Sequence, residues 1–366
     1  MSDLTCGFIG LGLIGGSIAR ALKEHFPNTK IIAYDVNPET LRQAGRDGVV
    51  DVAAARVDET FSECDYLFLC APVQKNDDNL AAVKRVIGSR CLLTDVGSVK
   101  STIHKAVRKA GLEHCFIGGH PMAGSERTGY VNSRAALLEN AYYILTPTPS
   151  VPEKRLEEYR SLVSRLGAIP LVLEWERHDY VTAAVSHLPH VIAASLVNLV
   201  RDSDSRDGIM KLIAAGGFKD ITRIASSSAA MWQQICLTNT ENISSLLQDY
   251  IDALCAVRSR LEQSDAEALY ALFDSARVYR DSFINASSGP IKRSFSFYVD
   301  IADKSGALAH IVSLLADQGI SIKNIGITHN RESEDGVLRL ELYREKDLDT
   351  SIAILRTAGY TLHVRS

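Results

Sequence analysis

Three glycines near the start of the chain have the spacing of a phosphate-binding turn. Gly10, Gly12 and Gly15 follow the pattern G-x-G-x-x-G between an apolar run and a stretch that can begin a helix. The first glycine of such a turn allows the bend, the second lets the backbone approach a pyrophosphate, and the third lets the helix pack on the strand. The helix start adds free N–H groups and a dipole that favours negative charge. We therefore expect a dinucleotide here; the alternative is a glycine-rich turn that binds nothing.

An acidic residue at a suitable distance indicates which dinucleotide would bind. The apolar run 30–34 ends at Asp35, about twenty residues beyond the last glycine, as this type of turn requires. A carboxylate there accepts hydrogen bonds from ribose hydroxyls and repels a 2′-phosphate, so it favours NAD over NADP. We expect NAD to be bound by Asp35 and by residues of the turn and the neighbouring strand ends, which are Gly10, Leu11, Gly12, Leu13, Ile14, Gly15, Cys70, Ala71, Pro72 and Asp95.

A histidine in a second glycine-rich stretch could supply acid–base chemistry beside this cofactor. His120 lies in Gly-Gly-His-Pro-Met-Ala-Gly-Ser-Glu (118–126), where a predicted strand ends. Removing a hydroxyl proton while hydride leaves the same carbon needs a group with a pKa near the working pH, which histidine has. Ser98, after a neighbouring strand, could bridge His120 to a substrate or cap a helix, and both roles are compatible. For His120 the alternative is a histidine that only caps a loop.

Two further stretches place polar residues in a region of helical apolar spacing. His187 and His190, in Ser-His-Leu-Pro-His, are three residues apart and could hold a metal, bind a substrate or pack in a core. No carboxylate or cysteine nearby completes a ligand set, so we expect no metal. In Gly-Gly-Phe-Lys-Asp-Ile-Thr-Arg (216–223) the glycines allow close backbone approach, and Arg223 could grip a carboxylate with two hydrogen bonds. An ion pair between Asp220 and Arg223 is the alternative.

The elements that must position these residues suggest three domains. Alternating apolar runs and helical stretches in residues 1–173 predict a Rossmann-type α/β domain with a parallel sheet. Ligands of such sheets bind at the carboxyl ends of the strands, where the polar residues named above are expected. Residues 174–288 show no convincing strand, so we expect an all-α domain that buries its apolar side chains against a second copy in a homodimer. Residues 294–366 have the β-α-β-β-α-β order of a small ferredoxin-like α+β domain.

Composition narrows the class of protein. The chain has 366 residues and a formal net charge of −4, which argues against a nucleic-acid partner. No apolar run of the ~18 residues that a membrane span needs is evident, and the first strand begins too early to leave room for a signal peptide. Seven cysteines are scattered without a C-x-x-C pair, which is typical of reduced thiols. We expect a cytoplasmic protein without a membrane segment.

Taken together, these motifs resemble those of the monofunctional prephenate dehydrogenases that carry a C-terminal ACT domain. The resemblance covers essentially the whole chain and depends on five stretches in the right order, 10–17, 95–100, 118–126, 186–190 and 216–223. It implies that NAD oxidises prephenate at its ring hydroxyl carbon, with loss of CO2 and formation of 4-hydroxyphenylpyruvate, in tyrosine biosynthesis.

The resemblance also implies roles for individual residues. His120 would polarise and deprotonate the substrate hydroxyl, with Ser98 in the same hydrogen-bond network. The substrate would be bound by a set in which Arg223 pairs with a carboxylate and an acidic residue gates the pocket: His190, Arg223, Glu126, Lys219, Asp220 and Trp232. The ACT domain would bind tyrosine as a feedback effector near Gly306, Ala307 and Leu308, or it would only assist dimerisation.

Three alternatives remain. An arogenate dehydrogenase performs the same chemistry on an amino rather than a keto side chain, and Arg223 would serve either substrate. A non-catalytic NAD-binding sensor of amino acids would need no proton acceptor, so the presence of His120 argues against it. A β-hydroxyacid dehydrogenase would share the cofactor fold and a helical dimer domain, but it would lack a reason for the ACT segment.

Overall fold

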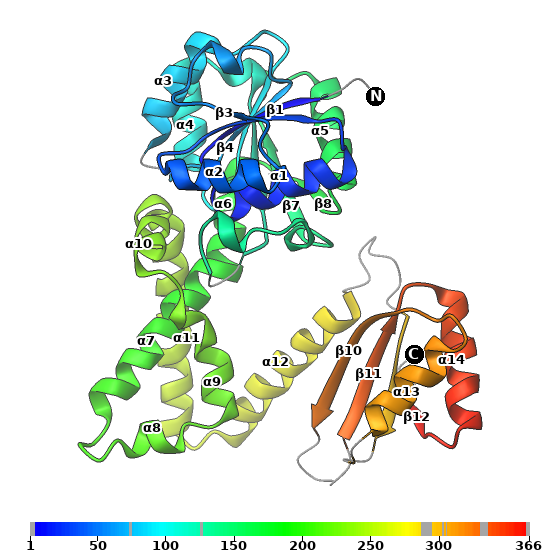
Figure 1. Cartoon of the computed structure of the whole chain (residues 1–366). Coiled ribbons are helices and arrows are strands. Elements are labelled where there is room, and N and C mark those ends of the chain that lie inside the picture. Colours follow the sequence, from blue (N-terminus) through cyan, green and yellow to red (C-terminus); the bar gives the residue numbers. More distant parts are fainter. Residues whose placement is uncertain are drawn as a thin grey trace. The chain divides into compact units, whose positions relative to one another are not determined.

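A computed structural model describes residues 4–72, 75–124, 127–286, 295–301, 304, 306–329 and 336–363. The chain divides into two compact units, Met1–Ser259 and Arg260–Ser366, whose elements are labelled in Figure 1. The domain boundaries at residues 173 and 288 remain predictions.

The first unit begins with the predicted parallel sheet. Its five strands have the order β3-β2-β1-β4-β5, and every pair is parallel. The strands are β1 (Thr5–Ile9), β2 (Lys30–Tyr34), β3 (Val52–Ala53), β4 (Tyr66–Leu69) and β5 (Leu92–Asp95). Strand order reverses at β1, so the carboxyl ends of β1 and β4 flank the switch point at which ligands of such sheets bind.

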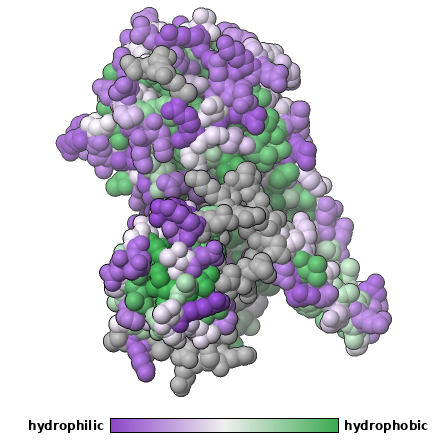
Figure 2. Space-filling model, turned by 90° about the vertical axis from the view of Figure 1, so that its right-hand side faces the viewer, coloured by the Kyte–Doolittle hydropathy of each residue, from purple (hydrophilic) through white to green (hydrophobic). Residues whose placement is uncertain are grey.

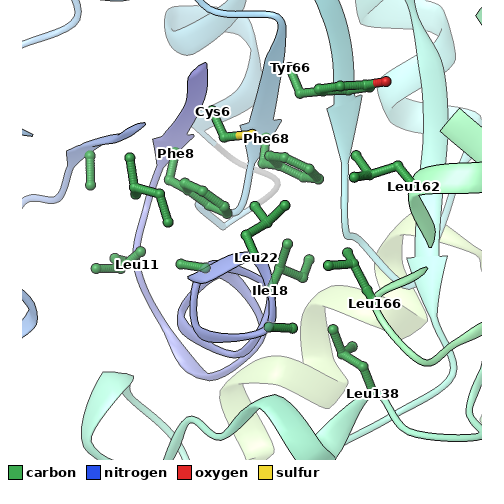
Figure 3. Close-up of a cluster of buried hydrophobic side chains, with 14 of the residues drawn as sticks. Cys6, Phe8, Leu11, Ile18, Leu22, Tyr66, Phe68, Leu138, Leu162 and Leu166 are labelled. Carbon is green, nitrogen blue, oxygen red and sulfur yellow. The ribbon is translucent and has the colours of Figure 1, made fainter. Parts of the chain in front are cut away.

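Helices cover both faces of this sheet (Figure 1). Figure 3 shows the cluster on one face, where Phe8 of β1 and Phe68 of β4 stack with ring centroids 4.8 Å apart above Ile18 and Leu22. Burial on two faces explains why these strands read as continuous apolar runs. The helices are α1 (Leu13–His25), α2 (Pro38–Arg46), α3 (Asn76–Val86), α4 (Ser101–Ala110) and α5 (Glu153–Arg165).

The next three strands depart from the prediction of one continuous parallel sheet. They form a separate sheet of order β6-β7-β8, made of β6 (Ile117–Pro121), β7 (Tyr142–Pro147) and β8 (Ile169–Val172). The pair β6–β7 is antiparallel, because the chain between these strands contains only loop and short 3₁₀ turns in its described part, and no crossover helix. A parallel bridge between Leu93 and Phe116 keeps β6 beside β5, so His120 stays near the end of the parallel sheet.

Helices follow, as predicted. The helical elements are α6 (Trp175–Thr182), a π-helical turn (Ala183–His187), α7 (Leu188–Ser203), α8 (Ile209–Ile213), α9 (Gly216–Thr222), a 3₁₀ turn (Arg223–Ser226), α10 (Ala229–Thr238), α11 (Thr240–Glu262) and α12 (Ala266–Ala286). The boundary between the two units falls within α11, after Ser259, so α12 belongs to the second unit.

The expectation that no segment is long and apolar enough to span a membrane is wrong. The helical stretch Trp175–Ser203 is 29 residues long with a hydropathy of 1.5, so by length and composition it qualifies as a membrane span. Its apolar residues alternate with small residues, histidines and a proline, which is why no contiguous apolar run is visible in the sequence. Only 17% of its most apolar window is buried. Such an exposed apolar surface also marks sites that another protein covers.

The second unit contains the predicted β-α-β-β-α-β order. Its antiparallel sheet has the order β10-β11-β9-β12, and one core combines Phe297 and Val299 of β9 with Ile311 and Leu315 of a helix. The elements are β9 (Phe295–Ile301), α13 (Ala307–Ala316), β10 (Ile322–His329), β11 (Gly336–Leu342), α14 (Glu345–Thr357) and β12 (Leu362–His363). The predicted linker 287–290 lies outside the described residues.

Gly7 provides a test of packing in the first unit. A Cβ at Gly7 would lie 2.5 Å from Leu67 Cδ1 and 2.9 Å from Phe61 Cδ1. Overpacking of this kind costs roughly 1–3 kcal/mol, so Gly7→Ala should lower the free energy of unfolding by that amount in a urea titration. Gly45→Ala is the matched control, because its Cβ would meet nothing closer than 4.0 Å and alanine favours helix by up to ~1 kcal/mol. Equal effects of the two substitutions would contradict this account of the core.

Candidate functional site

The glycine turn has the geometry of a dinucleotide cradle. Gly10 has φ +89°, and a Cβ there would lie 2.7 Å from the N atom of Ala71. A Cβ at Gly15 would lie 2.9 Å from the carbonyl oxygen of Gly10, whereas one at Gly12 would meet nothing within 4 Å. Gly12 is the N-cap of α1, and no side chain caps this helix. The turn is therefore closed against the sheet and open beside the helix start, where N–H groups can bind phosphate.

Asp35 lies beside this turn. Its carboxylate accepts hydrogen bonds from the N–H of Leu11 at 2.7 Å and from the N–H of Asn37 at 2.8 Å. The two bonds tie the glycine turn to the end of β2 and use one lone pair on each oxygen, so both oxygens keep acceptor capacity for ribose hydroxyls. These acceptor oxygens, together with the N–H groups at the helix start, fit NAD.

The end of β4 closes the other side of the turn. A Cβ at Gly10 would lie 2.8 Å from the carbonyl carbon of Cys70, and one at Gly15 would lie 3.1 Å from Cys70 Sγ. Burial raises the pKa of the Cys70 thiol strongly, so this thiol is neutral and serves as packing. The structure thus brings Cys70 and Ala71 to the glycine turn, with Pro72 next in the chain.

His120 lies at the end of a chain of buried side chains. Its Nδ1 is 2.8 Å from Nε2 of His178, and Nδ1 of His178 is 2.8 Å from Oδ1 of Asp179. Asp179 also accepts hydrogen bonds from the N–H groups of Lys100 at 2.7 Å and Ser101 at 2.8 Å. His120, His178 and Asp179 are each at most 9% exposed. This chain joins β6, α6 and the start of α4.

Hydrogen-bond logic assigns the protons in this chain. A carboxylate only accepts, so Nδ1 of His178 carries a proton and its Nε2 accepts one from Nδ1 of His120. The lone pair of the neutral His120 imidazole is then on Nε2, the atom that the chain leaves available. Burial lowers the pKa of His120 well below its usual value, and the charges of His178, Lys100 and His187 lower it further. His120 is therefore neutral at physiological pH and can accept a proton.

Asp179 remains charged despite its burial. Burial alone would raise the pKa of Asp179, but hydrogen bonds from His178, Lys100 and Ser101 together lower it. Asn239 completes the surroundings, since its Nδ2 donates to the carbonyl oxygen of Asp179 at 2.8 Å and lies 3.2 Å from Nδ1 of His187. Sequence reasoning missed His178, Asp179 and Asn239. The adjacent His-Asp pair was the available signal, but nothing local links it to His120, which is 58 residues away.

Ser98 and Asp95 follow or end β5 beside this chain. Ser98 is not the N-cap of α4, because the helix begins at Ser101 and the N-cap is Lys100. Its proposed place in the hydrogen-bond network stays a prediction. The Asp95 carboxylate accepts from the N–H groups of Gly97 at 2.9 Å and Gly119 at 3.2 Å, and it forms an ion pair with Lys100. Its predicted contact with the cofactor stays a prediction.

A second group of predicted residues clusters around Trp232. The ring of His190 stacks on Trp232 with centroids 3.7 Å apart, and His187 meets the same ring edge-on at 6.0 Å. Nδ1 of His190 donates to the carbonyl oxygen of Ser186 at 2.9 Å. Burial lowers the pKa of His190 and the charge of Arg223 lowers it further, whereas the hydrogen bond to Ser186 raises it. The structure therefore brings His190 and Trp232 together, and the place of Arg223 in the same site stays a prediction.

The remaining predicted residues have different positions. Lys219 and Asp220 are exposed on α9, which packs against α7. Glu126 lies outside the described residues. Gly306, at φ +88°, is the N-cap of α13 in the second unit, and Ala307 begins that helix.

Comparison with known proteins gives a consistent family. The family model described as prephenate dehydrogenase, nucleotide-binding domain matches residues 18–171, and the one described as prephenate dehydrogenase, dimerization domain matches residues 174–275. Prephenate dehydrogenase of Bacillus subtilis is 38% identical over 340 residues, covering 92% of this chain and 92% of the relative.

Solved structures are also similar over most of the chain. Prephenate dehydrogenase from A. aeolicus, in complex with hydroxyphenyl propionate and NAD+, superposes with a TM-score of 0.73 at 31% identity, covering 77% of this chain and 99% of that chain. Arogenate dehydrogenase of Synechocystis has a TM-score of 0.70 at 27% identity and covers 76% of this chain and 100% of that chain.

The position of Asp35 predicts how cofactor choice can be changed. Replacing it by serine removes the charge that repels a 2′-phosphate, and replacing the 85% exposed Val36 by arginine supplies a cation for it. The double variant Asp35→Ser/Val36→Arg should shift the ratio of the Kd values for NADPH and NADH at least about tenfold towards NADPH. Fluorescence titration of both nucleotides measures this ratio. Val36→Arg alone is the control and should shift it less; an unchanged ratio in the double variant would contradict the role of Asp35.

Proposed function

Because the chain belongs to the prephenate dehydrogenase family, we propose that it oxidises prephenate with NAD and that His120 accepts the proton of the substrate hydroxyl. The observation that carries the proposal is the buried chain from Asp179 through His178 to His120. It leaves one imidazole nitrogen, Nε2 of His120, as a neutral proton acceptor near the carboxyl end of the nucleotide-binding sheet.

The reaction that this site would serve balances without another reactant. NAD held by the glycine turn and Asp35 would supply the acceptor for the hydride of the carbinol carbon of prephenate. His120 accepts the hydroxyl proton as the C–O bond gains carbonyl character. The ring carboxylate then leaves as CO2, and the electron pair of the broken C–C bond completes the aromatic ring. The proton can return from His120 to the phenolate oxygen, which yields 4-hydroxyphenylpyruvate.

The physical task of the protein is alignment. A positioned general base contributes about 10²- to 10⁴-fold, and Asp179 fixes the orientation of His178, which in turn fixes His120. The low pKa of His120 keeps it unprotonated before the substrate binds. A bound dianion would raise that pKa, because nearby negative charge favours the imidazolium. The base would therefore gain strength when the substrate is in place.

Substrate recognition is proposed for the cluster around Trp232. Arg223 can bind a carboxylate with two parallel hydrogen bonds, and His190 offers Nε2 from a ring fixed by Trp232 and Ser186. The indole Nε1 of Trp232 is buried, and among the described residues it has no hydrogen-bond partner. An unsatisfied buried donor costs ~1–3 kcal/mol, which a substrate oxygen could recover. Lys219, Asp220 and Glu126 remain candidates at the edge of this site, and Ser98 a candidate partner of His120.

The assembly proposed for the chain is a homodimer through its helical part. The dimerization-domain model covers residues 174–275, and large apolar side chains are exposed there, among them Leu199, Leu212, Ile213 and Leu237. Figure 2 shows hydrophobic patches between hydrophilic residues on one face of the molecule. Mutual burial in a twofold dimer is the commonest way to cover such surfaces. We assign residues 1–173 to nucleotide binding, 174–288 to substrate binding and dimerisation, and 294–366 to regulation, in a cytoplasmic enzyme.

Arogenate is the second candidate substrate, because the chain is also similar to an arogenate dehydrogenase. The two substrates differ only in the keto or amino group of the side chain, and Arg223 can bind a carboxylate of either. Initial rates of NAD reduction with each substrate decide between them. A kcat/KM for prephenate at least about tenfold above that for arogenate, equal to ~1.4 kcal/mol in the transition state, is expected.

His120→Asn tests the proton acceptor. Asparagine keeps polarity and approximate size but cannot accept a proton at neutral pH, so kcat for prephenate should fall at least about 100-fold, while the Kd for NADH stays within error. His114→Asn is the matched control, because His114 is an exposed histidine in the preceding 3₁₀ turn. A near-normal kcat in His120→Asn would remove His120 from the mechanism.

Regulation by tyrosine is proposed for the second unit. Gly306 holds a left-handed conformation before α13, and a Cβ there would meet nothing within 4 Å. The N–H of Ala307 already donates to the carbonyl oxygen of Lys304 at 3.1 Å, so the N–H of Leu308 is the donor proposed here. Helix starts of this kind can bind the carboxylate of an amino acid.

Titration of the enzyme with L-tyrosine tests this regulation. Tyrosine should inhibit the full chain but not a chain that ends at residue 286, because the shorter chain lacks Gly306 and the helix start after it. The comparison is reasonable because the A. aeolicus enzyme has no counterpart for about a quarter of this chain. L-Phenylalanine is the ligand control. Identical inhibition curves for the two chains would reject a regulatory role for this unit.

A further inference from the structure

We propose that Lys100 is a positioning residue that holds the His120 imidazole in place through two independent attachments. One is to the backbone of Gly119, directly before His120, and the other is to Asp179, which orients the hydrogen-bonded partner of His120. The proposal deepens the proposed function and rests on it, since it concerns the alignment of the proton acceptor. Lys100 lies five residues after Asp95 and directly before α4, and its residue is 0% exposed.

The first attachment is to the backbone beside His120. The ammonium of Lys100 donates to the carbonyl oxygen of Gly119 at 2.7 Å and forms a buried ion pair with Asp95. The Asp95 carboxylate accepts from the N–H of Gly119 at 3.2 Å. The ion pair therefore binds both polar backbone groups of the residue that precedes His120, which fixes where this part of β6 lies relative to β5.

The second attachment is to the partner of the imidazole. The backbone N–H of Lys100 donates to Oδ1 of Asp179 at 2.7 Å, and that of Ser101 donates to Oδ2 at 2.8 Å. Asp179 orients His178, whose Nε2 lies 2.8 Å from Nδ1 of His120. One residue thus anchors the peptide that carries the imidazole and the carboxylate that orients it. These contacts come from three elements, β6, α4 and α6.

The glycine pair before His120 is required by this arrangement. A Cβ at Gly118 would overlap Thr146 Oγ1 and lie 3.2 Å from Cδ of Lys100. A Cβ at Gly119 would lie 2.5 Å from the carbonyl oxygen of Asp95. Any larger residue at either position would push β6 away from the buried pair. The Gly-Gly-His sequence is therefore explained by the approach of β6 to Asp95 and Lys100.

The charge of Lys100 has an effect separate from its contacts. Three groups face His120 from the packed elements, namely His178, His187 and Lys100, with Asp95 and Asp179 behind them. The cation lowers the pKa values of His120 and His178, in addition to the effect of burial. Replacing a buried ion pair by neutral side chains often costs little stability. The structure can therefore tolerate a neutral pair better than catalysis can.

The test compares Lys100→Met with the double variant Asp95→Asn/Lys100→Met, in which no unpaired charge is left in the core. Both should lower kcat for prephenate at least about tenfold, because small displacements of a catalytic group are costly, while KM for NAD changes less than about threefold in Lys100→Met, which leaves Asp95 in place. Both should also move the acid limb of kcat/KM to higher pH, and the single variant more, because it retains the Asp95 anion. Lys105→Met is the matched control, being the same substitution at an exposed site of α4.

The outcomes separate this proposal from the proposed function. A wild-type enzyme that does not reduce NAD with prephenate would contradict the proposed function itself. An active wild type together with a folded double variant of unchanged kcat and pH profile would overturn the role of Lys100. A melting temperature recorded for each variant shows folding, and failure of both Lys100 variants to fold would assign Lys100 to stability alone and also overturn the proposal.

Discussion

The geometry of the candidate active site depends on one buried carboxylate. Asp179 is 1% exposed, and its charge is maintained by hydrogen bonds from two consecutive backbone N–H groups and one imidazole. Burying an ion is costly unless it is fully hydrogen-bonded, so loss of any of these donors would raise the free energy of the folded state. Since the donors come from the start of α4 and from His178, α4 and α6 are held together beside His120, the proposed proton acceptor.

The two halves of the proposed site rest on different physics. The nucleotide half is made of backbone, in which glycines remove side chains so that N–H groups and the helix dipole can face phosphates. The substrate half is made of side chains with delocalised π systems or charge, namely His190, Trp232 and Arg223. A backbone cradle is insensitive to most substitutions outside its glycines, whereas the side-chain cluster depends on each ring. Selectivity between related substrates is therefore expected to reside in the helical half.

The sequence revealed features whose cause is local. The glycine turn and Asp35 have fixed spacing because they belong to one β-α-β unit, and His120 was identifiable because it ends a strand. The partners of His120 were missed because the contact between residues 120 and 178 exists only after β6 packs against α6. The antiparallel pair β6–β7 was missed for a related reason, since strand direction depends on the connection and not on the apolar pattern. The apolar stretch Trp175–Ser203 was missed because periodic apolar residues do not form a contiguous run.

The continuous helix from Trp175 to Ser203 contributes to both parts of the proposed site. His178 near its start is hydrogen-bonded to His120, the proposed proton acceptor, and His190, three turns later, stacks against Trp232. The π-helical turn Ala183–His187 between them changes the angular offset of these rings without interrupting the helix. The positions of both histidines therefore depend on the same helix. Affinity for the organic acid and the speed of its turnover should consequently be difficult to tune separately, both for natural variation and for engineers who reshape this pocket.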